Sequence, residues 1–232
     1  MENLREKIAL VLVGGEKENE LIDILREVKY VELRIDEFLR NYSKEQLVDW
    51  IKKIRKIGEN QIIGTCRWYK EAGENFFYIP DKKRLEIYRK IIDYVDIVDV
   101  EIKNKICENV IEIAKSKNKR IILSYHNFKK TPDYKILKKI IKTGKRKSAD
   151  FVKIATKISS PKNLFNLIKL TYEYSKKIKI ITVPMGVDIS ERLILLTFGS
   201  QFTYISFSKK VAPSQPSYSE LKNLTNLKLV LT

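Results

Sequence analysis

A single histidine and a lysine within an apolar segment are the residues most able to do chemistry here. His126, the only histidine among 232 residues, ends the apolar run 121–126, and Lys153 lies near the end of the next run, 151–155. An imidazole titrates close to neutral pH and can move protons, while a lysine amine can attack a carbonyl carbon. On adjacent strand ends, the two residues predict covalent amine catalysis with a proton-transfer partner.

The elements that must position these residues alternate along the chain. Runs rich in Ile and Val are typical of parallel strands buried on both faces. We expect strands at Ile8–Val13, Tyr30–Ile35, Gln61–Arg67, Ile97–Ile102, Arg120–His126, Phe151–Ala155, Ile178–Val183 and Thr203–Phe207. We expect amphipathic helices at Glu18–Val28, Ser43–Ile57, Asp81–Tyr94, Asn104–Ser116, Pro132–Thr143, Ser160–Lys176, Ile189–Phe198 and Ser217–Leu227.

Eight strand–helix units predict an α/β fold, a (β/α)8 TIM barrel. No linker rich in Pro, Gly or Ser interrupts the sequence, so we expect one domain over residues 1–232. A doubly wound open sheet is the alternative. It is disfavoured because no glycine-rich phosphate-binding pattern follows the first strand, where Gly14-Gly15 stands alone.

Polar residues cluster where the predicted strands end, which is where such barrels carry their active sites. Glu32 and Arg34 share one face of the second strand, because side chains two residues apart point to the same side. Ser124 and His126 do the same on the fifth strand, and Asp99 and Glu101 end the fourth. For Glu32, Asp99 and Glu101, a structural ring of ion pairs at the barrel mouth explains their positions at the strand ends as well as contact with a substrate does. A lysine inside an apolar strand is harder to explain structurally, which favours a chemical role for Lys153.

The composition restricts the classes of partner. The net charge is +17, which fits either a nucleic-acid binder or a lysine-rich surface around a site for a small anion. The densest basic cluster, 138–147, has no interleaved aromatic residues for base stacking, so we expect no nucleic-acid partner. Cys66 and Cys107 form no metal or disulfide pattern and are typical of a reducing, cytoplasmic setting. No apolar run is long enough to cross a membrane, and the first run lacks the features of a signal peptide.

These residues resemble the type I 3-dehydroquinate dehydratase family, a group of Schiff-base enzymes of the shikimate pathway. Seven patterns occur in the family's order over almost the whole chain. They are Glu32-Leu33-Arg34-Ile35-Asp36, Thr65-Cys66-Arg67 followed by Glu71, Asp99-Val100-Glu101, Ser124-Tyr125-His126-Asn127-Phe128, Val152-Lys153-Ile154-Ala155, Pro184-Met185-Gly186 leading to Arg192, and Phe198-Gly199-Ser200 leading to Ala212-Pro213-Ser214-Gln215.

The resemblance implies a role for each matching residue. Lys153 would form an imine with the substrate ketone, His126 would act as general acid and base, and Glu71 would orient the imidazole. Arg192 and Gln215 would hold the substrate carboxylate. The remaining pocket residues would be Glu32, Arg34, Arg67 and Ser214.

The chain departs from the family pattern at three positions. Glu191 stands where a serine is common, and Ser214 where glycine is usual. Val211 replaces a serine that often binds substrate, so Ser214 is the candidate to supply a hydroxyl instead.

We therefore expect a lyase that converts 3-dehydroquinate to 3-dehydroshikimate and water, with no metal or organic cofactor. Its only expected partners are this small-molecule substrate and a second copy of the chain in a homodimer. Two alternatives remain at this point. A class I aldolase would share Lys153 but would not require His126 or Arg192, and a basic nucleic-acid-binding protein would use none of the three.

Overall fold

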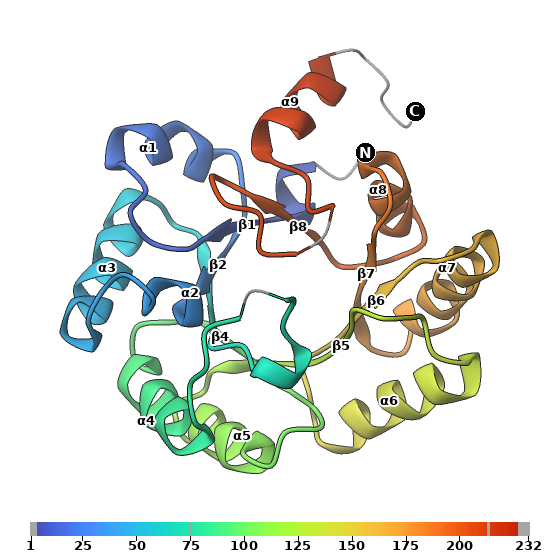
Figure 1. Cartoon of the computed structure of the whole chain (residues 1–232), viewed down its shortest axis with the longest axis horizontal. Helices are drawn as coiled ribbons and strands as arrows, with labels where there is room; N and C mark the ends of the chain where they lie inside the picture. The colour runs from blue at the N-terminus through green and yellow to red at the C-terminus, as the bar shows by residue number, and fades with distance from the viewer. Residues whose placement is uncertain (1–3, 75, 213, 227–232) are drawn as a thin grey trace.

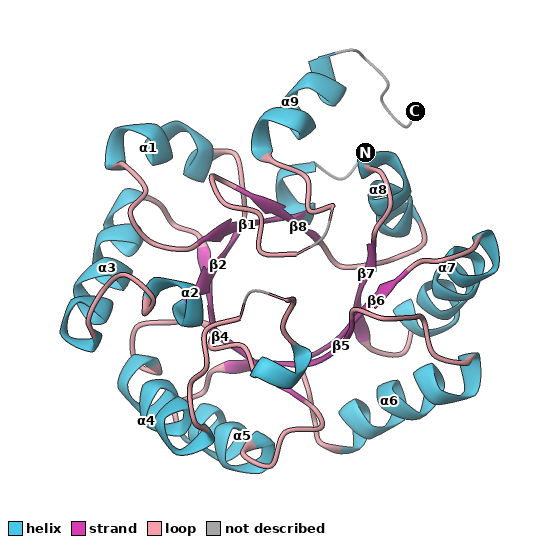
Figure 2. Cartoon of the chain, in the orientation of Figure 1, coloured by secondary structure: helices cyan, strands magenta, loops and turns pink. Residues whose placement is uncertain are grey.

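The computed structural model describes residues 4–74, 76–212 and 214–226, and in them the strands and helices alternate around a ring (Figures 1 and 2). The strands are β1 (Ile8–Leu12), β2 (Tyr30–Arg34), β3 (Gln61–Thr65), β4 (Ile97–Glu101), β5 (Arg120–Asn127), β6 (Phe151–Lys157), β7 (Lys179–Met185) and β8 (Thr203–Ser206). The helices are α1 (Glu18–Arg26), α2 (Ile35–Phe38), α3 (Lys44–Ile57), α4 (Asp81–Ile91), α5 (Cys107–Ser116), α6 (Tyr134–Arg146), α7 (Pro161–Ser175), α8 (Ile189–Thr197) and α9 (Tyr218–Asn226). Two short 3-10 helices are η1 (Leu4–Lys7) and η2 (Tyr69–Glu71).

All eight strands are parallel and follow the order β7-β6-β5-β4-β3-β2-β1-β8. The ring is completed between β7 and β8 by the residues just before β8. Gln201 N–H donates to the carbonyl of Ile180 at 2.9 Å, and Thr182 N–H donates to Ser200 Oγ at 3.1 Å. The strands therefore form a nearly closed (β/α)8 barrel, which confirms the predicted fold and excludes the open sheet.

Alternation along each strand divides the apolar residues into two cores. Ile8, Leu10 and Leu12 of β1 point outward and pack with the helices in the larger core. Ala9 and Val11 point inward and join the smaller core inside the barrel. Since polar residues of the other strands share this inward direction, the barrel interior carries the charged groups described below.

The predicted elements all appear, with shifted ends. Ile35 was expected to end the second strand, but it begins α2, whose four residues are all buried. β6 runs past the expected Ala155 to Lys157, because Thr156 and Lys157 pair with β7. α6 begins two residues late, after Asp133, and continues to Arg146. The expected end of the last helix, Leu227, lies outside the described residues.

Local signals at the helix starts explain which boundaries were accurate. α3 begins after Ser43, whose backbone N–H donates to Gln46 Oε1 at 2.8 Å, which is the capping-box pattern of a Ser followed three residues later by a Gln. α7 begins at Pro161 after Ser160. The late end of α6 includes Gly144, where a Cβ atom would clash with Val152 on β6. The glycine therefore lets this helix lie close to the sheet and is no helix terminator.

Candidate active site

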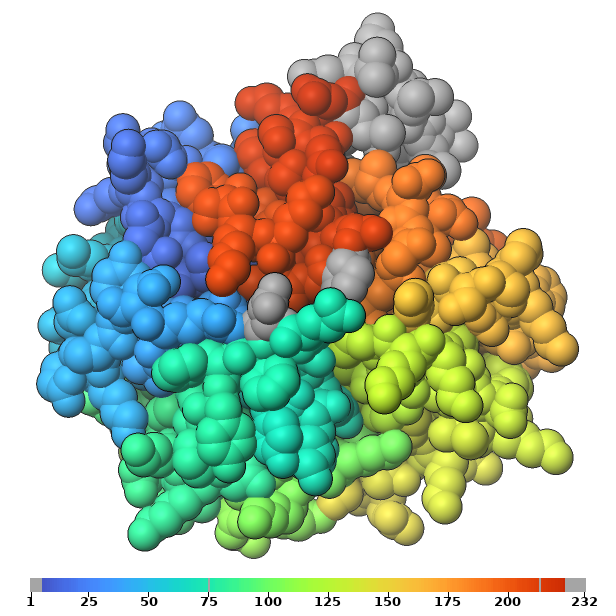
Figure 3. Space-filling view, in the orientation of Figure 1, coloured from blue at the N-terminus to red at the C-terminus, as the bar shows by residue number. Residues whose placement is uncertain are grey.

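A small cavity lies inside the barrel at the carboxyl ends of the strands. Figure 3 views this face of the molecule, where the segments that follow β3 and β8 lie over the centre. The cavity has a volume of about 50 Å³. Its walls include nearly all the residues predicted from the sequence, namely Glu32, Arg34, Arg67, Glu71, His126, Lys153, Arg192 and Gln215.

Lys153 lies deep in this cavity and is 4% exposed. It points inward from β6, and its Nζ lies 3.2 Å from Asp99 Oδ2 and 3.5 Å from Glu32 Oε1. Thr65 Oγ1 in turn donates to Glu32 Oε1 at 2.9 Å. Two carboxylates from β2 and β4 thus balance the charge of a lysine that the fold has removed from water, and they fix the position of its nitrogen.

Arg67 links these carboxylates into one buried network. Its guanidinium donates to Asp99 Oδ1 at 3.1 Å and Oδ2 at 3.2 Å, and to Glu101 Oε1 at 2.9 Å. Burial works against ionisation of Asp99, but the nearby cations of Arg67 and Lys153 hold the pKa of Asp99 below its usual range. Asp99 therefore stays charged beside Lys153. Glu101 also pairs with Arg84. Its role is therefore structural, in the ring of ion pairs that the sequence offered as the alternative to substrate contact.

His126 contacts Glu71 in two ways. The backbone N–H of His126 donates to Glu71 Oε2 at 2.7 Å, and the ring Nδ1 lies 3.3 Å from the same oxygen. Burial, together with the cations of Arg67 and Lys153, holds the pKa of His126 well below its usual range. Burial and the carboxylate of Glu101 raise the pKa of Glu71 to about 8. The imidazole is thus neutral at physiological pH, and the contact through Nδ1 leaves Nε2 for proton transfer.

Three further predicted residues line the cavity: Arg192 and Gln215, which were expected to bind the substrate carboxylate, and Arg34. Arg192 lies on α8 and is 1% exposed, and burial lowers its pKa to about 10, which keeps it charged at neutral pH. Gln215 lies between β8 and α9, and its Oε1 accepts the backbone N–H of Val211 at 3.0 Å. Arg34 pairs with Asp36 through two hydrogen bonds of 3.1 and 2.6 Å. Three polar groups on β2, α8 and the segment after β8 therefore converge on one cavity.

The departures from the family pattern have different outcomes. Val211 lines the cavity, as its position predicted. Glu191 does not, because its carboxylate accepts the backbone N–H of Asp188 at 3.1 Å and caps the start of α8. Ser214 is exposed, has a positive φ of 51° and is not among the described residues that line the inner cavity. In this structure it is not brought together with the other predicted site residues.

Tyr204 is a cavity residue that the sequence did not reveal. It points inward from β8 and is 4% exposed. A tyrosine among Thr203, Ile205 and Phe207 resembles an ordinary strand residue. The sequence feature that indicates the inward direction of Tyr204 is its spacing of two from Phe202, which also faces the barrel interior. That spacing is informative only once the facing of β8 is known.

A second, larger cavity of about 650 Å³ lies outside the first. Seven residues line both cavities and lie between the inner cavity and the outer one, namely Arg34, Ala72, Gly73, Phe128, Met185, Val211 and Ala212. The lining of the outer cavity contains more basic than acidic residues. It includes Lys129, Lys157, Lys209 and Lys210 against Glu37, which pairs with Lys209, and Glu74. A basic approach to the inner cavity favours anionic small molecules. Within the described residues, no three His, Cys, Asp or Glu side chains are grouped to hold a metal ion.

Comparison with known proteins identifies the family to which this geometry belongs. A model of the type I 3-dehydroquinase family matches residues 8–231. The 3-dehydroquinate dehydratase of Pyrococcus abyssi is 37% identical over 192 residues, which are 82% of this chain and 83% of that protein. The same enzyme from Thermodesulfovibrio yellowstonii is 30% identical over 213 residues, which are 90% of this chain and 89% of that protein.

Solved structures agree with the sequence comparison. The type I 3-dehydroquinate dehydratase of Clostridium difficile, solved with covalently modified comenic acid, has a TM-score of 0.80 at 26% identity and covers 97% of this chain and 92% of its own. A deoxyribose phosphate aldolase from Aeropyrum pernix shares the fold alone, with a TM-score of 0.58 at 16% identity over 97% of this chain and 91% of its own. The chain belongs to the type I 3-dehydroquinase family.

Proposed function

We propose that the inner cavity dehydrates 3-dehydroquinate to 3-dehydroshikimate through an imine on Lys153. The observation that carries this proposal is the buried lysine nitrogen beside two carboxylates, in a cavity that also contains His126 and Arg192. An amine, a neutral imidazole and a guanidinium are the groups that this reaction needs for covalent attachment, proton transfer and carboxylate binding.

The reaction proceeds in balanced steps. Lys153 gives up a proton, and its Nζ attacks the ketone carbon as the free amine. The ketone oxygen leaves as water with two of the three original ammonium protons, and a protonated C=N bond forms. The imine withdraws electrons from the adjacent carbon, so His126 can take a proton there. The electron pair left on that carbon then expels the hydroxyl group on the next carbon. His126 returns its proton to this group, a second water leaves, and hydrolysis of the imine releases the product and restores Lys153.

Arg192 and Gln215 would place the substrate for these steps. A guanidinium can bind a carboxylate through two parallel hydrogen bonds, and burial strengthens that contact. Since Gln215 Oε1 is used by Val211, the amide nitrogen is the group that would donate to the ligand. Glu32, Arg34 and Arg67 would bind substrate hydroxyl groups around Lys153.

A turnover assay tests the function directly. We expect the purified chain to consume 3-dehydroquinate and form a product with the ultraviolet absorbance of a conjugated enone acid. Borohydride added during turnover should reduce the imine and fix one ligand on Lys153. A class I aldolase would also form an imine that borohydride traps, but with its own carbonyl substrate, and it would leave 3-dehydroquinate unchanged. The absorbance change therefore distinguishes the two activities.

Replacing Glu71 by glutamine should lower kcat less than loss of the imidazole does. The variant removes the titratable carboxyl group but keeps an oxygen that can accept from the backbone N–H of His126, as Oε2 does at 2.7 Å. We expect kcat to fall about tenfold, which is below the range for a whole general acid–base group. Steady-state kinetics on Glu71→Gln and His126→Ala checks this order, and a larger loss in Glu71→Gln would contradict an orienting role.

Replacing Gln215 by alanine should weaken substrate binding. The change removes an amide that is 2% exposed on the cavity wall, and a lost neutral hydrogen bond corresponds to about a three- to tenfold rise in KM. The KM of Ser214→Ala is the comparison from the neighbouring position. Ser214 is exposed, and its contact with the substrate stays a prediction that this variant tests. An equal KM for wild type and Gln215→Ala would remove Gln215 from the site.

We also propose that the chain is one catalytic domain that works in the cytoplasm without a nucleic-acid partner. Both cysteines, Cys66 and Cys107, are buried free thiols, which fits a reducing compartment. No helix in the described part of the chain has the length and apolar character needed to span a bilayer. The homodimer stays a prediction that light scattering tests.

A further inference from the structure

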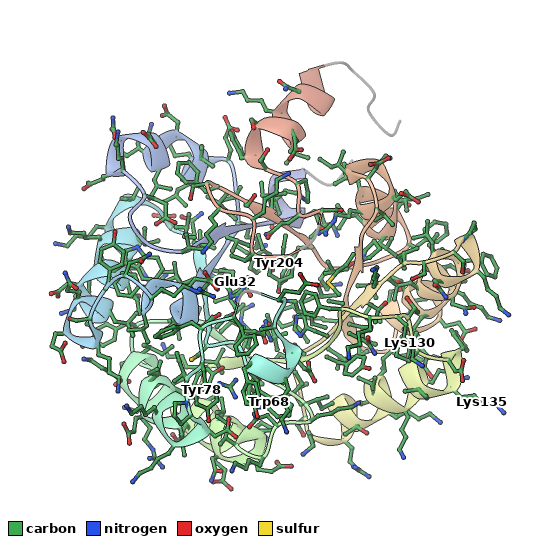
Figure 4. The ribbon with its side chains drawn as sticks, viewed as in Figure 1. Glu32, Trp68, Tyr78, Lys130, Lys135 and Tyr204 are labelled. Atoms are coloured by element: carbon green, nitrogen blue, oxygen red, sulfur yellow. The ribbon has the colours of Figure 1, made fainter. Side chains whose placement is uncertain are left out.

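Tyr204 lies against the lysine that would carry the substrate. Figure 4 places Tyr204 beside Glu32 at the centre of the barrel. The centroid of the Tyr204 ring lies 3.8 Å from Lys153 Nζ. The nitrogen is therefore held by Asp99 and Glu32 and by the electron-rich face of one aromatic ring.

The ring face suits both forms of this nitrogen. A cation over an aromatic face is attracted by the ring quadrupole, and the attraction is larger where water is excluded. The Lys153 ammonium is such a cation, and so is the protonated imine that the proposed function requires at the same atom. A ring that fits the resting lysine therefore also stabilises the intermediate, without any rearrangement of β8.

The hydroxyl group of Tyr204 has a separate feature. It is buried and has no hydrogen-bond partner among the described residues. A buried hydroxyl without a partner is costly, so most buried tyrosines have one. Tyr88 is a direct comparison, since its hydroxyl donates to the carbonyl of Asp99 at 2.7 Å. Nothing in the packing of β8 requires an oxygen at Tyr204, and a phenylalanine would fill the same space.

We propose that Tyr204 is a further substrate-positioning residue: its ring braces the nitrogen of Lys153, and its hydroxyl hydrogen-bonds an oxygen of the substrate attached there. This inference rests on the proposed function, because it assigns a contact within the imine intermediate. The phenol oxygen is one bond beyond a ring that already touches Nζ. It therefore lies within a few ångströms of the ligand atoms that become joined to that nitrogen.

Two substitutions separate the two contacts. Tyr204→Phe keeps the ring and removes the hydroxyl. We expect its KM for 3-dehydroquinate to rise about three- to tenfold, while the rate of borohydride-trapped adduct formation at saturating substrate stays within about twofold of wild type. Tyr204→Leu also removes the ring, and we expect adduct formation about tenfold slower. Equal melting temperatures for the leucine and phenylalanine variants would distinguish the loss of the ring contact from a general loss of packing.

The matched control is Tyr88→Phe, which removes a buried hydroxyl that does have a protein partner. We expect Tyr88→Phe to lower the melting temperature with KM unchanged, and Tyr204→Phe to raise KM without lowering the melting temperature. An unchanged KM in Tyr204→Phe would overturn the hydroxyl contact. Adduct formation at the wild-type rate in Tyr204→Leu would overturn the ring contact. A wild-type chain without dehydratase activity would overturn the proposed function and this inference together.

Discussion

Lys153→Ala is expected to lose nearly all turnover of 3-dehydroquinate and to form no adduct with borohydride. The substitution removes the nitrogen that forms the covalent bond, and no other described lysine lines the inner cavity. The remaining groups still include Arg192 and Gln215, so product should still bind. Mass spectrometry of the trapped protein and calorimetry with product measure the two outcomes separately.

The same substitution has a structural cost that must be separated from the chemical one. Without Lys153, Asp99 and Glu32 lose the cation that lies 3.2 and 3.5 Å from them, and an unbalanced buried charge is destabilising. Lys153→Met fills more of the space with no amine and should be equally inactive. Thermal unfolding shows whether either variant is folded at the assay temperature.

A lysine on the same strand provides the control for the trapping experiment. Lys157 is exposed at the rim of the outer cavity, so Lys157→Ala should still form one adduct on Lys153. An adduct on a different lysine in the wild-type chain, or full turnover by Lys153→Ala, would refute the covalent role. The first outcome would move the covalent site to another lysine, and the second would exclude Lys153 as the residue that forms an essential imine.

Much of this site could be predicted because strand periodicity and barrel topology are both readable from sequence. Spacing of two placed Glu32 with Arg34 and Ser124 with His126, and the strand ends of a barrel meet at one face. The resemblance then assigned Glu71, Arg192 and Gln215, which lie outside the strands, and these residues do line the cavity. No periodicity applies to such segments, so the residues alone would not have located them.

What could not be predicted depends on facing and on side-chain packing. The inward direction of Tyr204 follows from the register of β8 against β1, where Tyr204 pairs with Ala9. Ser214 is exposed and has a positive φ, and its sequence neighbours indicated neither. The capping role of Glu191 was not recognised either, although Asp188 three residues earlier is a typical helix start. The end of β2 was wrong because Ile35 is as apolar as the strand before it.

His126→Ala is expected to lower kcat by at least about 100- to 10,000-fold, the usual worth of a general acid–base residue. One imidazole serves both the removal of the proton and its return, so its loss affects two steps. No second histidine exists in the sequence to replace it. Imine formation does not need this proton transfer, so slow borohydride trapping on Lys153 should persist in the variant.

The pH dependence of the wild type provides an independent test of the same role. A general base acts only when unprotonated, and burial with the cations of Arg67 and Lys153 holds the pKa of His126 well below its usual range. As the pH falls, the free enzyme therefore keeps a neutral imidazole past the point where an ordinary histidine is protonated, and the acid limb of kcat/KM should lie below pH ~6.5. An acid limb above that value, or undiminished turnover in His126→Ala, would assign the proton transfer to another group. Glu71, with its pKa raised to about 8, is the neighbour that such a result would implicate.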